Sequence, residues 1–131
     1  MAKRILLVDD ELDFITIFST ILKNAGYIVE PAIKGREAIG AYIHSLHDNN
    51  PFALILLDIR MPDLNGVEVL KIIRNEERFR GIRDSLGVPI VLFTGYDDPQ
   101  LDLSSIKGPN DHMIKSRDNK ELLKMVAEKL K

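Results

Sequence analysis

Short apolar runs alternate with segments of helical periodicity along this chain. The β-rich runs are Lys3–Val8, Tyr27–Ala32, Phe52–Leu57, Val88–Phe93 and Asp111–Lys115. After each run, apolar residues recur every three or four positions, which is typical of helices with one buried face. This periodicity predicts helices over Glu11–Ala25, Lys34–Leu46, Val67–Phe79, Pro99–Ile106 and Asn119–Leu130. The pattern is weakest in Pro99–Ile106, where Ser104-Ser105 and the following Gly108-Pro109 limit a helix.

The alternation of strands and helices predicts an α/β fold. Three of the strands are continuous apolar runs, as expected when helices cover both faces of a sheet. Right-handed crossovers then give a doubly wound parallel sheet, and five strands indicate the order 2-1-3-4-5. The pattern continues to the end of the chain, so we expect one domain over residues 1–131.

Composition narrows the class of protein. The formal net charge of −2 disfavours a broad basic surface for direct binding of nucleic acid. Cysteine is absent from the sequence, which excludes disulfide scaffolds and thiol catalysis and suits a cytoplasmic location. No stretch approaches the roughly 20 apolar residues of a membrane span, so we expect no membrane segment.

Acidic residues stand where the first and third strands end. Asp9 and Asp10 follow the first run, and Asp58 directly follows the five apolar residues from Ala53 to Leu57. In a sheet of this order, ligands bind at the carboxyl ends of strands 1 and 3. Asp9 and Asp10 alone could simply begin a helix. Crowded with Asp58, however, they predict a site for a hard divalent cation, and we expect Mg²⁺.

Two further polar residues end strands at the same edge. Thr94 follows the fourth run and supplies a hydroxyl, and Lys115 ends the fifth and supplies a positive charge. A carboxylate nucleophile beside a metal, a lysine and a hydroxyl suits transfer of a phosphoryl group onto Asp58.

The stretches VDDE, LLDIRMPDLNG, FTG and HMIKS together resemble the receiver domain of two-component response regulators, of the chemotaxis-regulator-like kind. The resemblance covers essentially the whole chain and implies a flavodoxin-like (βα)5 fold. It implies that Asp58 accepts a phosphoryl group from a phosphohistidine of a sensor histidine kinase or a histidine phosphotransfer protein. It also implies that Asp9, Asp10, Asp58 and the backbone carbonyl of Arg60 surround Mg²⁺, while Thr94 and Lys115 hold the phosphoryl oxygens.

By the same resemblance, phosphorylation alters a face made by Pro99–Ile106, Asp111–Lys115 and Asn119–Leu130. That face would bind an output partner, which the sequence does not identify, and is also a candidate surface for a homodimer. A receiver is a phosphoacceptor signalling domain that assists its own phosphorylation and dephosphorylation, and not a turnover enzyme.

The chain departs from the family pattern at several positions. His112 stands where receivers usually carry a switching aromatic residue, so an altered readout and an ordinary exposed strand residue both remain open. Ser116 replaces a proline that often has a cis bond, and we expect a trans Lys115–Ser116 bond. The segment Asn75–Gly87 is longer than usual. Arg60 and Tyr96 occupy the positions that set phosphoryl lifetime in the family, and their bulk predicts a long-lived phosphorylated state.

Three other classes of protein remain as alternatives. An aspartate-nucleophile phosphatase would carry a second acid two residues after its nucleophile, where this chain has Arg60. A flavin-binding module would carry a Ser-, Thr- and Gly-rich loop after the first strand, in place of Asp9-Asp10-Glu11. A degenerate receiver that acts only as a binding module stays open because of His112 and Ser116.

Overall fold

Five parallel strands form one sheet in the order β2-β1-β3-β4-β5. The computed structural model describes residues 2–95, 101–115 and 119–131. The strands are β1 (Arg4–Val8), β2 (Ile28–Ala32), β3 (Leu54–Asp58), β4 (Ile90–Thr94) and β5 (Asn110–Ile114). The predicted strand order is confirmed, and it brings the ends of β1 and β3 next to each other.

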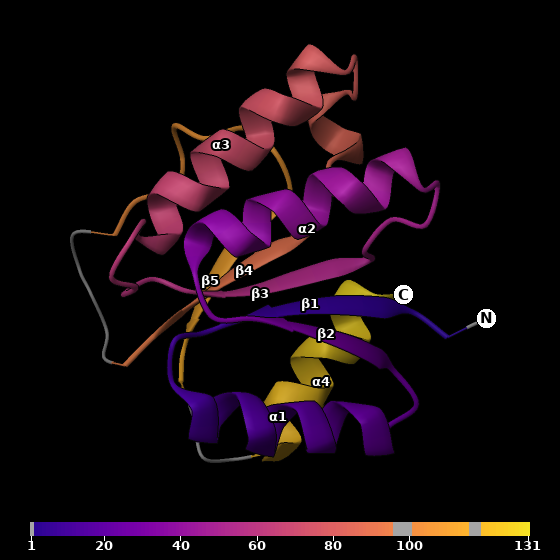
Figure 1. The fold of residues 1–131 in the computed structure, drawn as a ribbon, viewed down its shortest axis with the longest axis vertical. Coiled ribbons are helices and arrows are strands. Elements are labelled where there is room, and N and C mark those ends of the chain that lie inside the picture. Colours follow the sequence, from indigo (N-terminus) through magenta and orange to yellow (C-terminus); the bar gives the residue numbers. More distant parts are fainter. Residues whose placement is uncertain (1, 96–100, 116–118) are drawn as a thin grey trace.

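Four α-helices cover the two faces of the sheet in pairs (Figure 1). They are α1 (Leu12–Asn24), α2 (Gly35–His47), α3 (Gly66–Phe79) and α4 (Asn119–Lys129), and a 3₁₀ turn, η1 (Asp84–Leu86), follows α3. Helices α2 and α3 pack on one face, and α1 and α4 pack on the other.

The alternation of side chains along each strand builds a separate core under each pair of helices. In β1, Leu6 and Val8 belong to the core under α2 and α3, whereas Ile5 and Leu7 belong to the core under α1 and α4. Successive side chains of a strand point to opposite faces, so a strand buried on both sides must be apolar throughout. This requirement explains the unbroken apolar runs of β1, β3 and β4.

The helix expected over Pro99–Ile106 is wrong for the residues that the structure describes. Residues 101–106 form an irregular segment with a turn in which the Ile106 amide donates to the Leu103 carbonyl. The side chain of Asp102 accepts a hydrogen bond from the amide of Ser104 at 2.9 Å. Such local side-chain bonds compete with helical ones, and Gly108-Pro109 then prevents helix continuation. The fold therefore has four α-helices in its described part, and not the five of a full (βα)5 pattern.

A buried ion pair connects α3 with the other elements on its side of the sheet. Arg74 and Glu77 are each 3% exposed, and Arg74 Nη1 lies 2.7 Å from Glu77 Oε1. The other oxygen of Glu77 accepts hydrogen bonds from the Tyr42 hydroxyl of α2 and from the Val88 amide before β4. This carboxylate therefore holds α2, α3 and the start of β4 together.

The guanidinium of Arg74 extends the same network to β5. It donates to the side chain of Asn110 through Nε and Nη2, and to the carbonyl of Pro109. Gly108 has a φ of +131°, and a Cβ there would lie 2.6 Å from Arg74 Nε. Glycine at position 108 thus satisfies both the backbone conformation and the space that the guanidinium needs.

We expect Arg74→Met to destabilise the fold by about 3–5 kcal/mol, because it leaves the buried Glu77 carboxylate without its counter-ion. Urea unfolding at pH 7 measures this change. The matched control is Arg78→Ala, which removes a half-exposed pair with Asp84 and should cost about 1 kcal/mol or less. A loss below 1 kcal/mol for Arg74→Met would show that the network contributes little.

Candidate functional site

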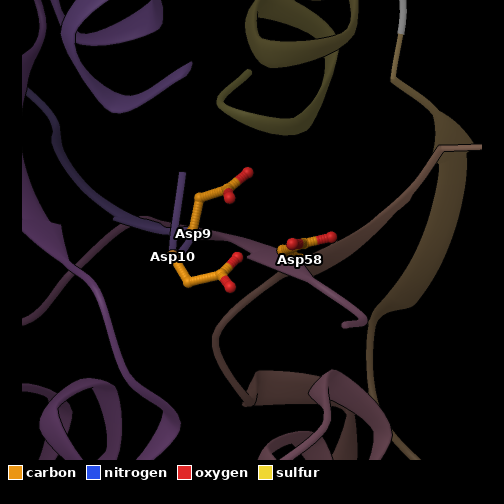
Figure 2. A group of neighbouring side chains, drawn as sticks. All are labelled: Asp9, Asp10 and Asp58. Carbon is orange, nitrogen blue, oxygen red and sulfur yellow. The ribbon is translucent and has the colours of Figure 1, made fainter. Parts of the chain in front are cut away.

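Three carboxylates gather where β1 and β3 end side by side (Figure 2). Asp58 is the last residue of β3, and Asp9 and Asp10 directly follow β1. Each of the three offers an oxygen within 4.8 Å of the others. Asp9 and Asp58 are buried, whereas Asp10 is exposed, so solvent and ions reach the cluster from the Asp10 side. The clustering that the sequence predicts for these three residues is confirmed.

Lys115 reaches into this acidic cluster from beyond β5. Its amide donates to the Thr94 carbonyl at 2.6 Å, which extends the β4–β5 pairing by one residue. Its Nζ lies 2.6 Å from Asp9 Oδ2 and 3.7 Å from Asp58 Oδ2. The structure therefore brings Lys115 to the predicted place, in closest contact with Asp9.

Two residues in or just before α1 complete the surroundings of Lys115 and were not predicted. Glu11 Oε1 lies 3.6 Å from Lys115 Nζ, and the ring of Phe14 lies under the same atom at 4.3 Å. Phe14 also packs against Phe18 and Phe93. Because the ring is anchored in the core, it limits where the ammonium can lie. An aromatic residue in the first turn after paired acids is the only signal that the sequence offers.

Burial and mutual repulsion change the acidity of the cluster. Burial and, after it, the charge of Asp9 raise the pKa of Asp58 to about 6 in spite of the lowering effects of Lys115 and the Arg60 amide. Burial also raises the pKa of Asp9, although Lys115 and the Glu11 amide counteract it. Burial acts to lower the pKa of Lys115, but its contacts with Asp9 and the charges of Asp58 and Glu11 hold that pKa above the ordinary value.

The loop from β3 to α3 is fixed by contacts of Asp63 and of Gly66, the first residue of α3. Gly66 donates to the Ile59 carbonyl at 2.7 Å, and a Cβ at Gly66 would lie 2.5 Å from the Asp58 carbonyl. The carboxylate of Asp63 accepts from the amides of Gly35 and Arg36 at the start of α2. Hydrogen bonds from these two amides lower the pKa of Asp63 to about 2. These contacts hold the loop that follows Asp58 against α2.

The other residues predicted for the site lie around this cluster. Thr94 is buried at the end of β4, one position after Phe93, which pairs with Asp58. The Arg60 amide hydrogen-bonds to Asp58. His112 is exposed on β5, opposite Leu92. Tyr96 and Ser116 lie outside the described residues.

The chemistry of the cluster fits a divalent cation. Among the described residues that meet here, four carboxylates surround one ammonium group, that of Lys115. The carboxylates are those of Asp9, Asp10, Glu11 and Asp58. Burial is the main reason why the pKa values of Asp9 and Asp58 are raised, and the charge of Asp9 adds to the effect on Asp58. A hard cation with oxygen ligands would relieve this excess of negative charge, and Mg²⁺ takes one or two carboxylates together with water.

Comparison with known proteins assigns the chain to a protein family. The family model of the response regulator receiver domain matches residues 5–127. The chain belongs to this family. Receiver domains are signalling domains of two-component response regulators, and the five-stranded order and the acidic cluster agree with that membership.

Relatives and solved structures support the assignment. The chain is 35% identical over 126 residues to the CAI-1 autoinducer sensor kinase/phosphatase CqsS of Vibrio cholerae. The aligned region covers 95% of this receiver but only 17% of the length of CqsS. It is 32% identical to the response regulator TrrA of Thermotoga maritima in complex with Mg²⁺ and BeF, with a TM-score of 0.78 and coverage of 98% and 99%. A structure of the histidine kinase ThkA in complex with TrrA matches at 30% identity and a TM-score of 0.77, with the same coverage.

In the part of the receiver that the structure describes, none of the helices has both the length and the apolar character that crossing a membrane requires.

We expect Asp58→Asn to stabilise the receiver at pH 7 in EDTA by up to about 3 kcal/mol. Folding raises the pKa of Asp58 from 3.8 to about 6, so ionising it opposes folding. This penalty is complete above pH 6 and disappears as the pH falls towards 4, so the two proteins should converge there. Urea unfolding between pH 4 and pH 8 measures the difference.

Asp63→Asn serves as the matched control because the pKa of Asp63 is shifted the opposite way. Ionised Asp63 stabilises the fold, so its loss should lower stability at pH 7 and have less effect as the pH falls towards 2. A stability of Asp58→Asn equal to that of the wild type at pH 7 would contradict the electrostatic account of the cluster.

Proposed function

We propose that this receiver is a phosphorylation-controlled signalling switch that accepts a phosphoryl group on Asp58. The observation that carries the proposal is the meeting of Asp9, Asp10 and Asp58 within 4.8 Å, with Lys115 beside them. Membership of the response regulator receiver family supports it. Residues 1–131 act as one receiver domain in this proposal.

In the transfer step, a carboxylate oxygen of Asp58 attacks the phosphorus of a phosphohistidine. An O–P bond forms, the N–P bond of the donor breaks, and its electron pair stays on the imidazole of the partner. The attack needs an ionised Asp58, yet its pKa is raised to about 6 in the surroundings described here. Contact with cations therefore favours the reactive form.

The residues that would hold Mg²⁺ are Asp9, Asp10, Asp58 and the backbone carbonyl of Arg60. When bound, the ion would neutralise part of the negative charge of the acids and of the phosphoryl oxygens. Support comes from the cluster geometry and from TrrA, whose structure contains Mg²⁺ and BeF.

Lys115 and Thr94 would bind the phosphoryl group once it is attached. The ammonium of Lys115 is already 3.7 Å from Asp58 and would contact a phosphoryl oxygen as a point charge. The hydroxyl of Thr94, at the end of the neighbouring strand, would donate to another. The same residues would assist dephosphorylation, so the chain acts as a self-assisting signalling domain and not as a turnover enzyme.

The proposed phosphoryl donor is a sensor histidine kinase or a histidine phosphotransfer protein. The complex of ThkA with TrrA supports a kinase partner, because TrrA shares this fold across the whole chain. We propose a cytoplasmic site of action, with no direct contact to nucleic acid or membrane.

The proposed output surface consists of residues 101–109, β5 and α4. Phosphorylation would draw Thr94 and Lys115 towards Asp58 and change the arrangement of this surface, because residues 101–109 and β5 lie between these two residues in the chain and α4 follows Lys115. His112 lies on β5 within the surface and is our candidate for the switch residue. The surface would bind an output partner or a second copy of the receiver.

Incubation with acetyl phosphate and Mg²⁺ should add one phosphoryl group to the receiver, detected by intact-mass spectrometry. Asp58→Asn should abolish the addition, and EDTA should suppress it in the wild type because the acids then repel the incoming phosphoryl oxygens.

The matched control is Asp48→Asn, which removes an exposed carboxylate paired with His44 and should leave phosphorylation unchanged. Undiminished addition in Asp58→Asn would place the acceptor elsewhere and overturn the proposal.

We also expect the double substitution Arg60→Gly, Tyr96→Ala to shorten the lifetime of the phosphorylated receiver by about tenfold or more. In the receivers that this chain resembles, these positions control access of water to the phosphoryl group, and a tenfold change corresponds to only about 1.4 kcal/mol in the barrier. Loss of the added mass is followed over time after the donor is removed. An unchanged rate of decay would remove both side chains as lifetime determinants.

A further inference from the structure

A polar pocket lies between α3 and the irregular segment that follows β4, and it contains none of the residues of the acidic cluster. Its volume is about 210 Å³. The residues that line it, which we call the α3 pocket, are Lys71, Arg74, Asn75, Arg78, Ser105 and Ile106.

One face of α3 supplies all the nitrogen-bearing side chains of the α3 pocket. Lys71, Arg74, Asn75 and Arg78 follow the spacing i, i+3, i+4 and i+7, which places them in one row along a helix. Ser105 adds a hydroxyl from the opposite wall. In the part of the chain that the structure describes, the pocket lining contains three cations and no carboxylate.

The innermost of these cations is held in place before any ligand arrives. Arg74 is 3% exposed, and its guanidinium is positioned by Glu77, Asn110 and the Pro109 carbonyl. A positioned arginine loses little conformational entropy on binding an anion. Arginine side chains are mostly exposed in proteins, so a buried arginine that lines a pocket is uncommon.

The two outer cations retain binding capacity. Arg78 gives its Nε to Asp84 at 3.2 Å, and its side chain remains 47% exposed. Lys71 forms no ion pair with any residue that the structure describes, and it is exposed. The mouth of the pocket therefore carries an excess of positive charge, although the whole chain has a net charge of −2.

We propose that the α3 pocket binds a small oxyanion of the phosphate class. Arg78 gives its Nε to Asp84 and offers its Nη groups to a tetrahedral oxyanion, while Lys71 offers a mobile point charge. Asn75 and Ser105 offer neutral donors. Arg74 contributes positive charge at the base of the pocket, because most of its N–H groups already donate to Glu77, Asn110 and the Pro109 carbonyl. Its volume is below the roughly 300–1,000 Å³ of pockets that enclose drug-sized ligands, which favours a phosphate or diphosphate group as the part inside. The group is either free or carried by a larger molecule that extends into solvent.

Such a ligand would connect α3 to the segment that joins β4 to β5. Ser105 and Ile106 belong to that segment, whereas the other four lining residues belong to α3. Occupation of the pocket would restrain the segment that links Thr94 to β5. Binding at the α3 pocket does not depend on phosphorylation of Asp58, so this proposal can be tested independently of the proposed function.

Titration of the ¹⁵N-labelled receiver, followed by amide chemical shifts, tests the site. The ligands are inorganic phosphate, pyrophosphate and AMP, each at 150 mM ionic strength (roughly physiological) with EDTA present. We expect saturable shifts centred on Lys71, Asn75 and Ser105. The double substitution Lys71→Ala, Arg78→Ala should weaken the affinity about tenfold or more, because it removes two charge-assisted contacts.

The matched control is Lys23→Ala, which removes an exposed cation from the last turn of α1 and should leave the affinity unchanged. Both altered α3 residues are exposed, and a cooperative urea transition confirms that the double variant is folded. Tighter binding of AMP than of phosphate supports an oxyanion carried on a nucleotide, and binding of phosphate and pyrophosphate alone supports a free ion. Shifts that do not saturate, or an affinity that the double substitution leaves intact, overturn the proposal.

Discussion

The arrangement of the functional end of this receiver depends on the position of one ammonium group among four carboxylates. Lys115 lies between Asp9, Asp58 and Glu11, with Asp10 beside them, and the Phe14 ring lies under its charge. Without that cation, β1 and β3 would bring buried negative charges together with no compensation. With it, the negative charge is compensated only in part, and the remaining excess is what a divalent cation would neutralise in the function that we propose.

The sequence predicted the sheet and the residues of the cluster because both follow from short-range rules. A strand covered on two faces must be apolar at every position, and a carboxylate directly after such a run must lie at its tip. The roles of Glu11 and Phe14 could not be predicted, because they depend on the position of the Lys115 side chain, which is about a hundred residues away in the sequence. The absent helix over the described part of Pro99–Ile106 shows the limit of periodicity, because one Asp102 side-chain bond and Gly108-Pro109 outweigh a weak apolar pattern.

The buried pair of Arg74 and Glu77 was equally invisible to pattern analysis. Both residues occur on a helix where charged residues are common, and nothing local distinguishes them from the exposed Arg78 and the half-buried Glu76. Only the packing of α2, α3 and β5 shows that their partners are Tyr42, Val88 and Asn110. Each partner occupies a donor or acceptor that burial would otherwise leave unsatisfied, so the network specifies one arrangement of these elements.

The two ends of β5 differ in how they are held. Asn110, its first residue, is clasped by the guanidinium of Arg74 and also donates to the Ile106 carbonyl, which fixes it against α3. The side chain of Lys115, just past the last residue of the strand, is held mainly by charge in a cluster whose net charge would change in the function that we propose. A change of charge at the cluster would therefore reach β5 through its Ile114 end, whereas the hydrogen bonds of Asn110 with Arg74 and Ile106 lie at the opposite end of the strand.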